Sequence, residues 1–207
     1  MPESPRFVVL VPVKTLALAK SRLTGLPDER RQDLAAAFAQ DTIAAVLDTT
    51  LVERVMVLTD DFRFADKLAS AGCTVIPDGA SDDLNASLRQ AAAEAHRRWP
   101  RLRPVALAAD LPALKAVDLS QALAEVPSGP AYVADHAGSG TTLYTASYAE
   151  FAPSFGNDSA AEHARAGATS IDGDLPTLRL DVDDVGDLGR ALSLGVGIHT
   201  AAVTGRV

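Results

Sequence analysis

Three basic side chains stand close together near the start of a chain that has few lysines. Lys14 follows the apolar run FVVLVPV at 7–13, and Lys20 and Arg22 lie in the loop behind it. Lysine ammonium groups and an arginine fork can neutralise several phosphate oxygens together, which predicts a clamp for a polyphosphate. A solvated basic turn is the alternative. The loop is no Walker loop, because neither GxxxxGK[ST] nor GxGxxG occurs in the sequence.

Carboxylates at two other places could bind a divalent cation. Asp110 follows the apolar run PVALAA, and Asp181 and Asp183 stand two residues apart in TLRLDVDD. Residues two apart in an extended segment point to the same face, so these two side chains would act together, with Asp184 opposite. Hard cations such as Mg²⁺ prefer oxygen ligands. Alternatively, Asp184 could cap the following helix, and each acid could be an ordinary surface residue.

Glycines and hydroxyl residues form a third group of candidates in DHAGSGTTL at 135–143 and FGNDSAAEH at 155–163. Gly138 and Gly140 would let backbone amides approach an anion closely. Ser159 would open a short helix, whose N-terminus favours negative charge. Hydroxyl donors in the first segment are Ser139, Thr141 and Thr142. The two segments could bind a small phosphate, or they could be a glycine-rich turn and an ordinary helix start.

A protein nucleophile is not indicated. The chain has no GxSxG elbow, and Cys73 has no histidine near it in sequence. Ser159 and His163 would share a helical face, but such pairs arise by chance and no orienting acid stands at a known position. The other histidines, His96, His136 and His199, form no metal-ligand motif.

The charge balance disfavours polyanionic partners, because the chain has no net positive charge to attract them. The chain has 27 acidic and 19 basic residues, for a formal charge of −8, which disfavours nucleic acid and anionic membrane surfaces. The single Cys73 excludes an intrachain disulfide and a thiolate-rich metal site, and it suits a reducing cytoplasm. No apolar run approaches the ~20 residues that span a bilayer, so we expect a mature cytoplasmic protein.

The elements that must position these residues alternate between short β-branched runs and amphipathic helices. Strands are predicted at 7–13, 54–59, 73–76 and 104–108, and helices at 28–48, 61–72, 84–99, 159–166 and 185–194. This alternation is typical of an α/β fold with a mostly parallel sheet. Ligands collect at the carboxyl ends of the strands in such sheets, where Lys14 and Asp110 are expected.

Six motifs in order carry a family resemblance: VPVKTLALAKSRL, DDLNASL, ADLPAL, GSGTTL, FGNDSAAEHARAGA and LDVDD. Together they resemble the phosphoenolpyruvate or 2-phospho-L-lactate guanylyltransferases of deazaflavin coenzyme F-420 biosynthesis. The resemblance covers nearly the whole chain. It implies one nucleotidyltransferase domain over residues 1–207, with the three-layer α/β/α nucleotide-diphospho-sugar transferase-like fold and a mostly parallel mixed sheet.

The resemblance also implies roles for particular residues. GTP would be bound by Lys14, Lys20, Arg22 and Asn85; Mg²⁺ by Asp110, Asp181 and Asp183; and the acceptor phosphate by Gly140, Thr141, Gly156 and Ser159. Lys14, Lys20 and Asp110 would be the catalytic residues. The family pattern differs at Ser139, where a threonine is usual, and at Asp184, whose extra acid has no assigned role.

The implied reaction is attack by the acceptor phosphate on the α-phosphorus of GTP, with release of pyrophosphate. The acceptor would be phosphoenolpyruvate, favoured on composition alone, or 2-phospho-L-lactate, and the product could pass to a downstream coenzyme-assembling transferase. Two alternatives remain. The chain could be another nucleotidyltransferase of this fold, acting on a molybdopterin or a sugar phosphate, although VPVK replaces the LAGG-type loop usual there. It could also be a non-catalytic nucleotide-binding partner subunit.

Overall fold

A computed structural model of the protein describes residues 5–13, 23, 25–80 and 83–205. Within these residues one sheet has the strand order β3-β2-β1-β4-β6-β5-β7. Its strands are β1 (Phe7–Pro12), β2 (Val52–Leu58), β3 (Thr74–Ile76), β4 (Arg103–Leu107), β5 (Ala131–Ala134), β6 (Thr141–Thr145) and β7 (Thr169–Ser170). In the described sheet β6 is antiparallel to both of its neighbours, and the other pairings are parallel.

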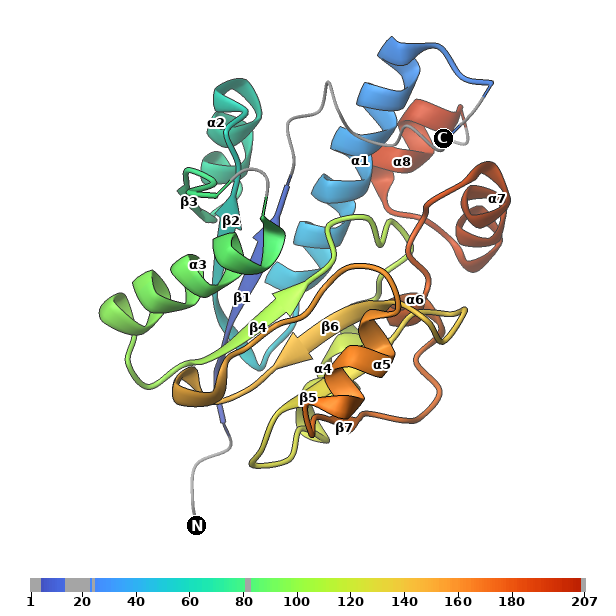
Figure 1. Ribbon diagram of the computed structural model, residues 1–207. Coiled ribbons are helices and arrows are strands. Elements are labelled where there is room, and N and C mark those ends of the chain that lie inside the picture. The colour runs from blue at the N-terminus through green and yellow to red at the C-terminus, as the bar shows by residue number, and fades with distance from the viewer. Residues whose placement is uncertain (1–4, 14–22, 24, 81–82, 206–207) are drawn as a thin grey trace.

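Helices cover both faces of the sheet, as Figure 1 shows. The helices are α1 (Asp28–Leu47), α2 (Phe62–Ser70), α3 (Leu84–Arg98), α4 (Ala116–Ala124), α5 (Ser159–Arg165), α6 (Pro176–Arg179), α7 (Val185–Leu194) and α8 (Ile198–Thr204). A short 3₁₀ helix, η2, spans Tyr148–Glu150. The predicted three-layer α/β/α fold with a mostly parallel mixed sheet is therefore confirmed.

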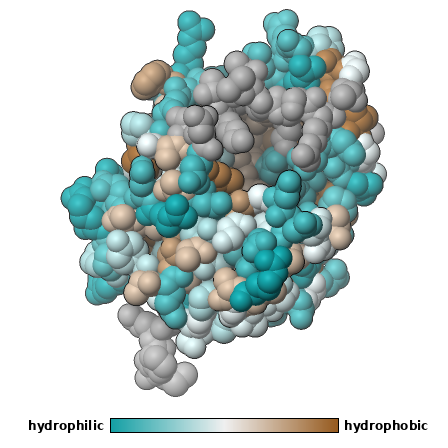
Figure 2. All heavy atoms as spheres, in the orientation of Figure 1, coloured by the Kyte–Doolittle hydropathy of each residue, from teal (hydrophilic) through white to brown (hydrophobic). Residues whose placement is uncertain are grey.

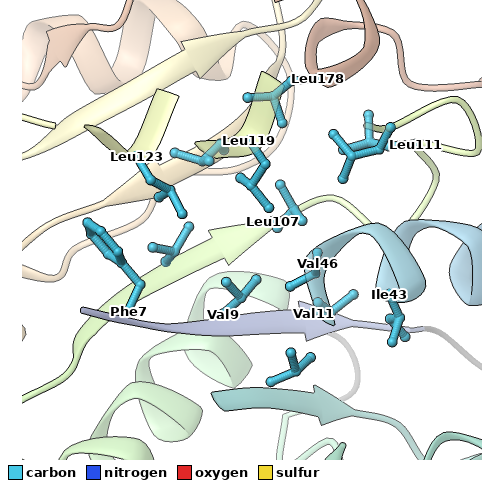
Figure 3. Packing of buried hydrophobic residues seen from close by; sticks show 14 of the residues in the cluster. Phe7, Val9, Val11, Ile43, Val46, Leu107, Leu111, Leu119, Leu123 and Leu178 are labelled. Carbon is cyan, nitrogen blue, oxygen red and sulfur yellow. The ribbon is translucent and has the colours of Figure 1, made fainter. Parts of the chain in front are cut away.

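The two faces of β1 show why its sequence reads as a continuous apolar run. Phe7, Val9 and Val11 point to one face, where they share a buried cluster with residues of α1, α4 and α6 (Figure 3). Phe64 and Leu68 of α2 belong to the same cluster. Val8 and Leu10 point to the other face and pack with α3 and α5. A strand with both faces buried needs apolar residues at every position, which is what the parallel part of this sheet requires.

Helix starts follow local capping chemistry. The side chain of Asp61 accepts from the amide of Phe64 at 3.0 Å, and that of Asp83 accepts from Ala86 at 2.9 Å. Asp184 caps α7 in a capping box with Asp187. The interpretation of Asp184 as a helix cap is confirmed, because an N-cap carboxylate satisfies amides that the helix leaves unpaired.

The structure adds helices α4, α6 and α8, which the sequence reading did not predict. Trp99 ends α3 at its C-cap, where it is half-buried and packs against a core cluster. Strongly apolar residues form separate small areas among the coloured residues in Figure 2. Among the described residues, no helix combines the length and apolar character needed to cross a membrane.

Candidate active site

The acidic residues predicted from two distant segments meet beside the carboxyl end of β4. The amide of Val182 donates to the carbonyl oxygen of Asp110 at 3.0 Å, which places the 181–183 segment against the loop after β4. Val182 is fully buried, whereas Asp181 is half-buried and Asp183 is exposed. The backbone thus alternates as expected, with the apolar side chain directed into the core and the two acids directed away from it.

The carboxylates in this region repel one another. Burial and, in decreasing order of effect, the negative charges of Asp110, Asp183 and Asp135 together raise the pKa of Asp181 to about 7. Desolvation and like charges both penalise the ionised form of a carboxyl group. A cation bound here would relieve that repulsion. Among the described residues, however, no three His, Cys, Asp or Glu side chains are arranged so that they could hold a metal ion.

A histidine that the sequence reading did not assign lies between two of the acids. Nδ1 of His136 is 3.8 Å from Oδ1 of Asp181, and its Nε2 is 3.5 Å from Oδ1 of Asp187. The other carboxylate oxygen of Asp187 accepts from the amides of Asp183 at 3.1 Å and Asp184 at 3.0 Å. The first turn of α7 therefore fixes the backbone of the acidic segment. The pattern D-x-x-D before an amphipathic run could have revealed this capping box.

The glycine-rich segment is the loop of the β5–β6 hairpin, and its amides already bind a carboxylate. Asp135 accepts from the amide of Ser139 at 3.0 Å and from that of Gly140 at 2.9 Å. A Cβ at Gly140 would lie 2.4 Å from Oδ2 of Asp135, so a side chain at this position would have to displace that carboxylate. Gly140 was predicted to bind the acceptor phosphate, but in this structure its amide donates to Asp135.

Two predicted acceptor residues, Thr141 and Ser159, are in direct contact. The hydroxyl of Ser159 donates to Oγ1 of Thr141 at 3.1 Å, and Nδ1 of His163 lies 3.0 Å from the same oxygen. The amide of Ala160, in the first turn of α5, donates to the carbonyl of Ser139 at 3.1 Å. The hairpin loop and α5 are thereby joined around a small polar group. Ser159 and His163, which are four residues apart in the sequence, are both in contact with Oγ1 of Thr141 from β6.

Asn85 of α3 holds the loop that contains Gly156. Its side-chain amide nitrogen donates to the carbonyl of Phe155 at 2.9 Å, and its oxygen accepts from the amide of Phe155 at 2.8 Å. Gly156 follows with φ 146°, a backbone conformation that side chains rarely adopt. This paired contact across 70 residues leaves no signal in the sequence.

The acidic group and the hydroxyl group share one edge of the sheet. Leu107 of β4 pairs with Leu143 of β6, and the next amide, Ala108, donates to the carbonyl of Thr142 at 2.8 Å. Because β4 and β6 are antiparallel, the end of β4 lies beside the start of β6. Asp110 and Thr141 are therefore brought to the same place. The predicted clamp residues Lys14, Lys20 and Arg22 lie outside the described residues.

Comparison with solved structures identifies the fold class. A putative nucleotide-diphospho-sugar transferase from Desulfovibrio desulfuricans G20 matches with a TM-score of 0.67 and 17% identity, over 89% of this chain and 85% of that one. A nucleotidyl transferase from Methanothermobacter matches with a TM-score of 0.62 and 16% identity, over 89% and 95% of the two chains. The protein thus has the nucleotide-diphospho-sugar transferase-like fold.

Sequence relatives identify the family within this fold class. A phosphoenolpyruvate guanylyltransferase from Streptomyces coelicolor is 46% identical over 98% of this chain and 97% of its own. One from Salinispora arenicola is 44% identical over 96% and 94%. The family described as guanylyl transferase CofC like matches residues 7–203. The chain belongs to this family, and it is a nucleotidyltransferase.

Proposed function

We propose that the protein transfers GMP from GTP to the phosphate of phosphoenolpyruvate and releases pyrophosphate, the reaction implied for deazaflavin coenzyme biosynthesis. Full-length relatives named for this activity support the choice of substrates. The structural observation that carries the proposal is the meeting of Asp110, Asp181 and the Thr141–Ser159 pair at one sheet edge. A reaction between two phosphates needs a place for a cation beside hydroxyl donors for an anion, and we propose that this edge serves as both.

Asp110, Asp181 and Asp183 are proposed to hold Mg²⁺. Carboxylate oxygens are the ligands that this cation prefers, and the mutual repulsion around Asp181 supports a positive charge there. When bound, Mg²⁺ would neutralise phosphate oxygens of GTP and stabilise the charge that develops on them. Asp135 is excluded from the proposed set because its two oxygens accept from the hairpin amides.

Lys14, Lys20 and Arg22 are proposed to bind the triphosphate and to stabilise the departing pyrophosphate. They follow β1 in the sequence, and β1 runs parallel to β4, so the carboxyl end of β1 lies at the same edge of the sheet as that of β4, which precedes Asp110. Asn85 is proposed to lie near the nucleoside. Its amide keeps one further N–H and one further lone pair beyond the two bonds to Phe155, and these could contact the base.

The chemistry requires no general base. A phosphate monoester has its second pKa near ~6, so the attacking oxygen is already ionised at neutral pH. The barrier is instead electrostatic, because two unit charges about 4 Å apart repel by about 4 kcal/mol at an effective dielectric of about 20. The proposed cation site and basic clamp oppose this repulsion. Thr141 and Ser159 would hold the acceptor phosphate in line with the α-phosphorus.

The test is a product analysis with competing acceptors. Purified protein is incubated with GTP and Mg²⁺ and with phosphoenolpyruvate, 2-phospho-L-lactate, 3-phosphoglycerate, a sugar phosphate or molybdopterin. Pyrophosphate release and mass spectrometry are recorded with and without the downstream coenzyme-assembling transferase. We expect a guanylylated product from phosphoenolpyruvate. We also expect its formation to stop when EDTA removes Mg²⁺. No pyrophosphate from any acceptor would favour a non-catalytic subunit, and turnover with another acceptor alone would replace phosphoenolpyruvate.

A further inference from the structure

His163 is a fully buried histidine with a defined hydrogen-bonding partner on each ring nitrogen. The amide of Ser154 donates to Nε2 at 2.9 Å, and Oγ1 of Thr141 lies 3.0 Å from Nδ1. A ring nitrogen that accepts an amide proton carries none itself, so the proton of the neutral ring is on Nδ1 and points at Thr141. The side chain therefore directs this proton at the threonine hydroxyl, and a backbone hydrogen bond with Ser159, one helical turn earlier in α5, likewise favours a protonated ring nitrogen.

Aromatic neighbours fix the orientation of this ring. Tyr144 stacks on it with centroids 4.6 Å apart and an angle of 20°, and Tyr132 stacks at 5.7 Å. Phe155 meets it edge-on at 5.6 Å. Burial among these residues lowers the pKa of His163 to about 4, so the ring is neutral at pH 7. At pH 7 the His163 ring is therefore held in one orientation and stays neutral, so its Nδ1–H keeps pointing at Thr141.

Counting the protons of the group shows what this donor does. Nδ1 of His163, the hydroxyl of Thr141 and the hydroxyl of Ser159 carry one proton each. His163 donates to Thr141, and one further proton lies between the two hydroxyls. One hydroxyl proton is then left over for an acceptor outside the group. Thr141 accepts both bonds and is 9% exposed against 1% for Ser159, so the spare proton is on Thr141.

We propose that His163 is a positioning residue that makes Thr141 a hydrogen-bond donor to the phosphate of the phospho-acid. The inference rests on the proposed function, which places that phosphate at Thr141 and Ser159. A phosphate dianion has only acceptor oxygens, so it needs a donor at this position. With the opposite tautomer Nδ1 would take the threonine proton, and the same hydroxyl would present a lone pair to the anion. Through the ring, the Ser154 amide thus decides whether the Thr141 hydroxyl presents a proton or a lone pair.

Two substitutions separate the two ring nitrogens. His163→Asn places an amide N–H near Nδ1, so it keeps the donor to Thr141 but loses the acceptor for Ser154. His163→Gln places a carbonyl near Nε2, so it keeps the acceptor but loses the donor. His163→Phe keeps the ring contacts with Tyr144 and loses both polar atoms. The readouts are the KM for phosphoenolpyruvate, the KM for GTP and the melting temperature.

The proposal predicts that one substitution changes the KM for phosphoenolpyruvate and the other changes the melting temperature. A hydrogen bond to a charged group corresponds to about tenfold or more in affinity, so His163→Gln and His163→Phe should raise the phosphoenolpyruvate KM about tenfold and leave the GTP KM unchanged. His163→Asn should stay within about threefold of wild type in KM but melt at a lower temperature, because the Ser154 amide loses its partner. A purely structural role would make KM follow the melting temperature instead.

The outcomes also separate this inference from the proposed function. A folded wild-type protein without turnover on phosphoenolpyruvate refutes both. An active wild type whose Asn and Gln variants have equal phosphoenolpyruvate KM values refutes the role of His163 alone. Where a His163 variant does not fold, Thr141→Val and Thr141→Ser replace it. The valine should raise that KM about tenfold and the serine should not, since only serine keeps the donor; equal KM values for the two would overturn the proposal.

Discussion

Acidification should destabilise this protein through His163. Its pKa is lowered from 6.5 to about 4 in the folded state, mainly by burial, and its side chain is fully buried. A folded pKa below the unfolded one means that stability is intact above pH 6.5 and is lost as the pH falls toward 4. The full loss is about 3 kcal/mol at ~1.4 kcal/mol per pKa unit, and about 2 kcal/mol of it is reached near pH 5.

Urea unfolding at pH 7.5 and near pH 5 measures this effect. The titration of carboxylates is common to wild type and variant, so it cancels when the two proteins are compared at each pH. Wild type should lose about 2 kcal/mol more than His163→Phe between the two pH values. His96→Asn is the matched control, because it removes a partly exposed histidine that stacks on Tyr148.

The reasoning is refuted if wild type and His163→Phe lose equal stability between the two pH values. It is also refuted if wild type loses as much more stability than His96→Asn as it does than His163→Phe. The effect would then not depend on burial of the histidine. In either case the neutral, buried ring described above would not be the group that acid charges.

Four further predictions concern the site. Asp110→Asn should keep the fold, checked by circular dichroism, and lose most Mg²⁺-dependent turnover; wild-type rates in the folded variant would remove Asp110 from the metal site. Lys20→Ala should raise the KM for GTP and leave that for phosphoenolpyruvate unchanged, so an unaltered GTP dependence would remove Lys20 from the clamp. Ser159→Ala should weaken phosphoenolpyruvate binding about tenfold by calorimetry and spare GTP, whereas equal losses for both ligands would contradict separate subsites. Gly140→Ala should lower the unfolding free energy by about 1–3 kcal/mol, because its Cβ would lie 2.4 Å from Oδ2 of Asp135 and break that carboxylate's bonds; an unchanged urea midpoint would show that the loop relaxes freely.

The carboxylate and hydroxyl candidates from distant segments were found in the sequence because each has a local signature. Asp110 follows a buried run, and Asp181 and Asp183 alternate with apolar residues that the structure buries. Their meeting involves the backbone bond from Val182 to Asp110 and the packing of Leu180 and Val182 against residues of α1, which no local pattern encodes. The same holds for Asn85, whose partner Phe155 lies 70 residues away. The residues were therefore predictable, and their contacts were not.

Sequence by itself determined many of the regular elements, though not helices α4, α6 and α8, because hydrophobic periodicity and capping residues act within a few residues of each other. The buried run of β1 and the caps Asp61 and Asp184 are of this kind. Tertiary structure alone decided where polar groups found their partners. Helix α8 shows this, since Asp41 of α1 accepts from its His199 and Thr200 amides across 158 and 159 residues. A buried N–H must be satisfied by whatever acceptor the fold brings near, and chain distance does not limit which one that is.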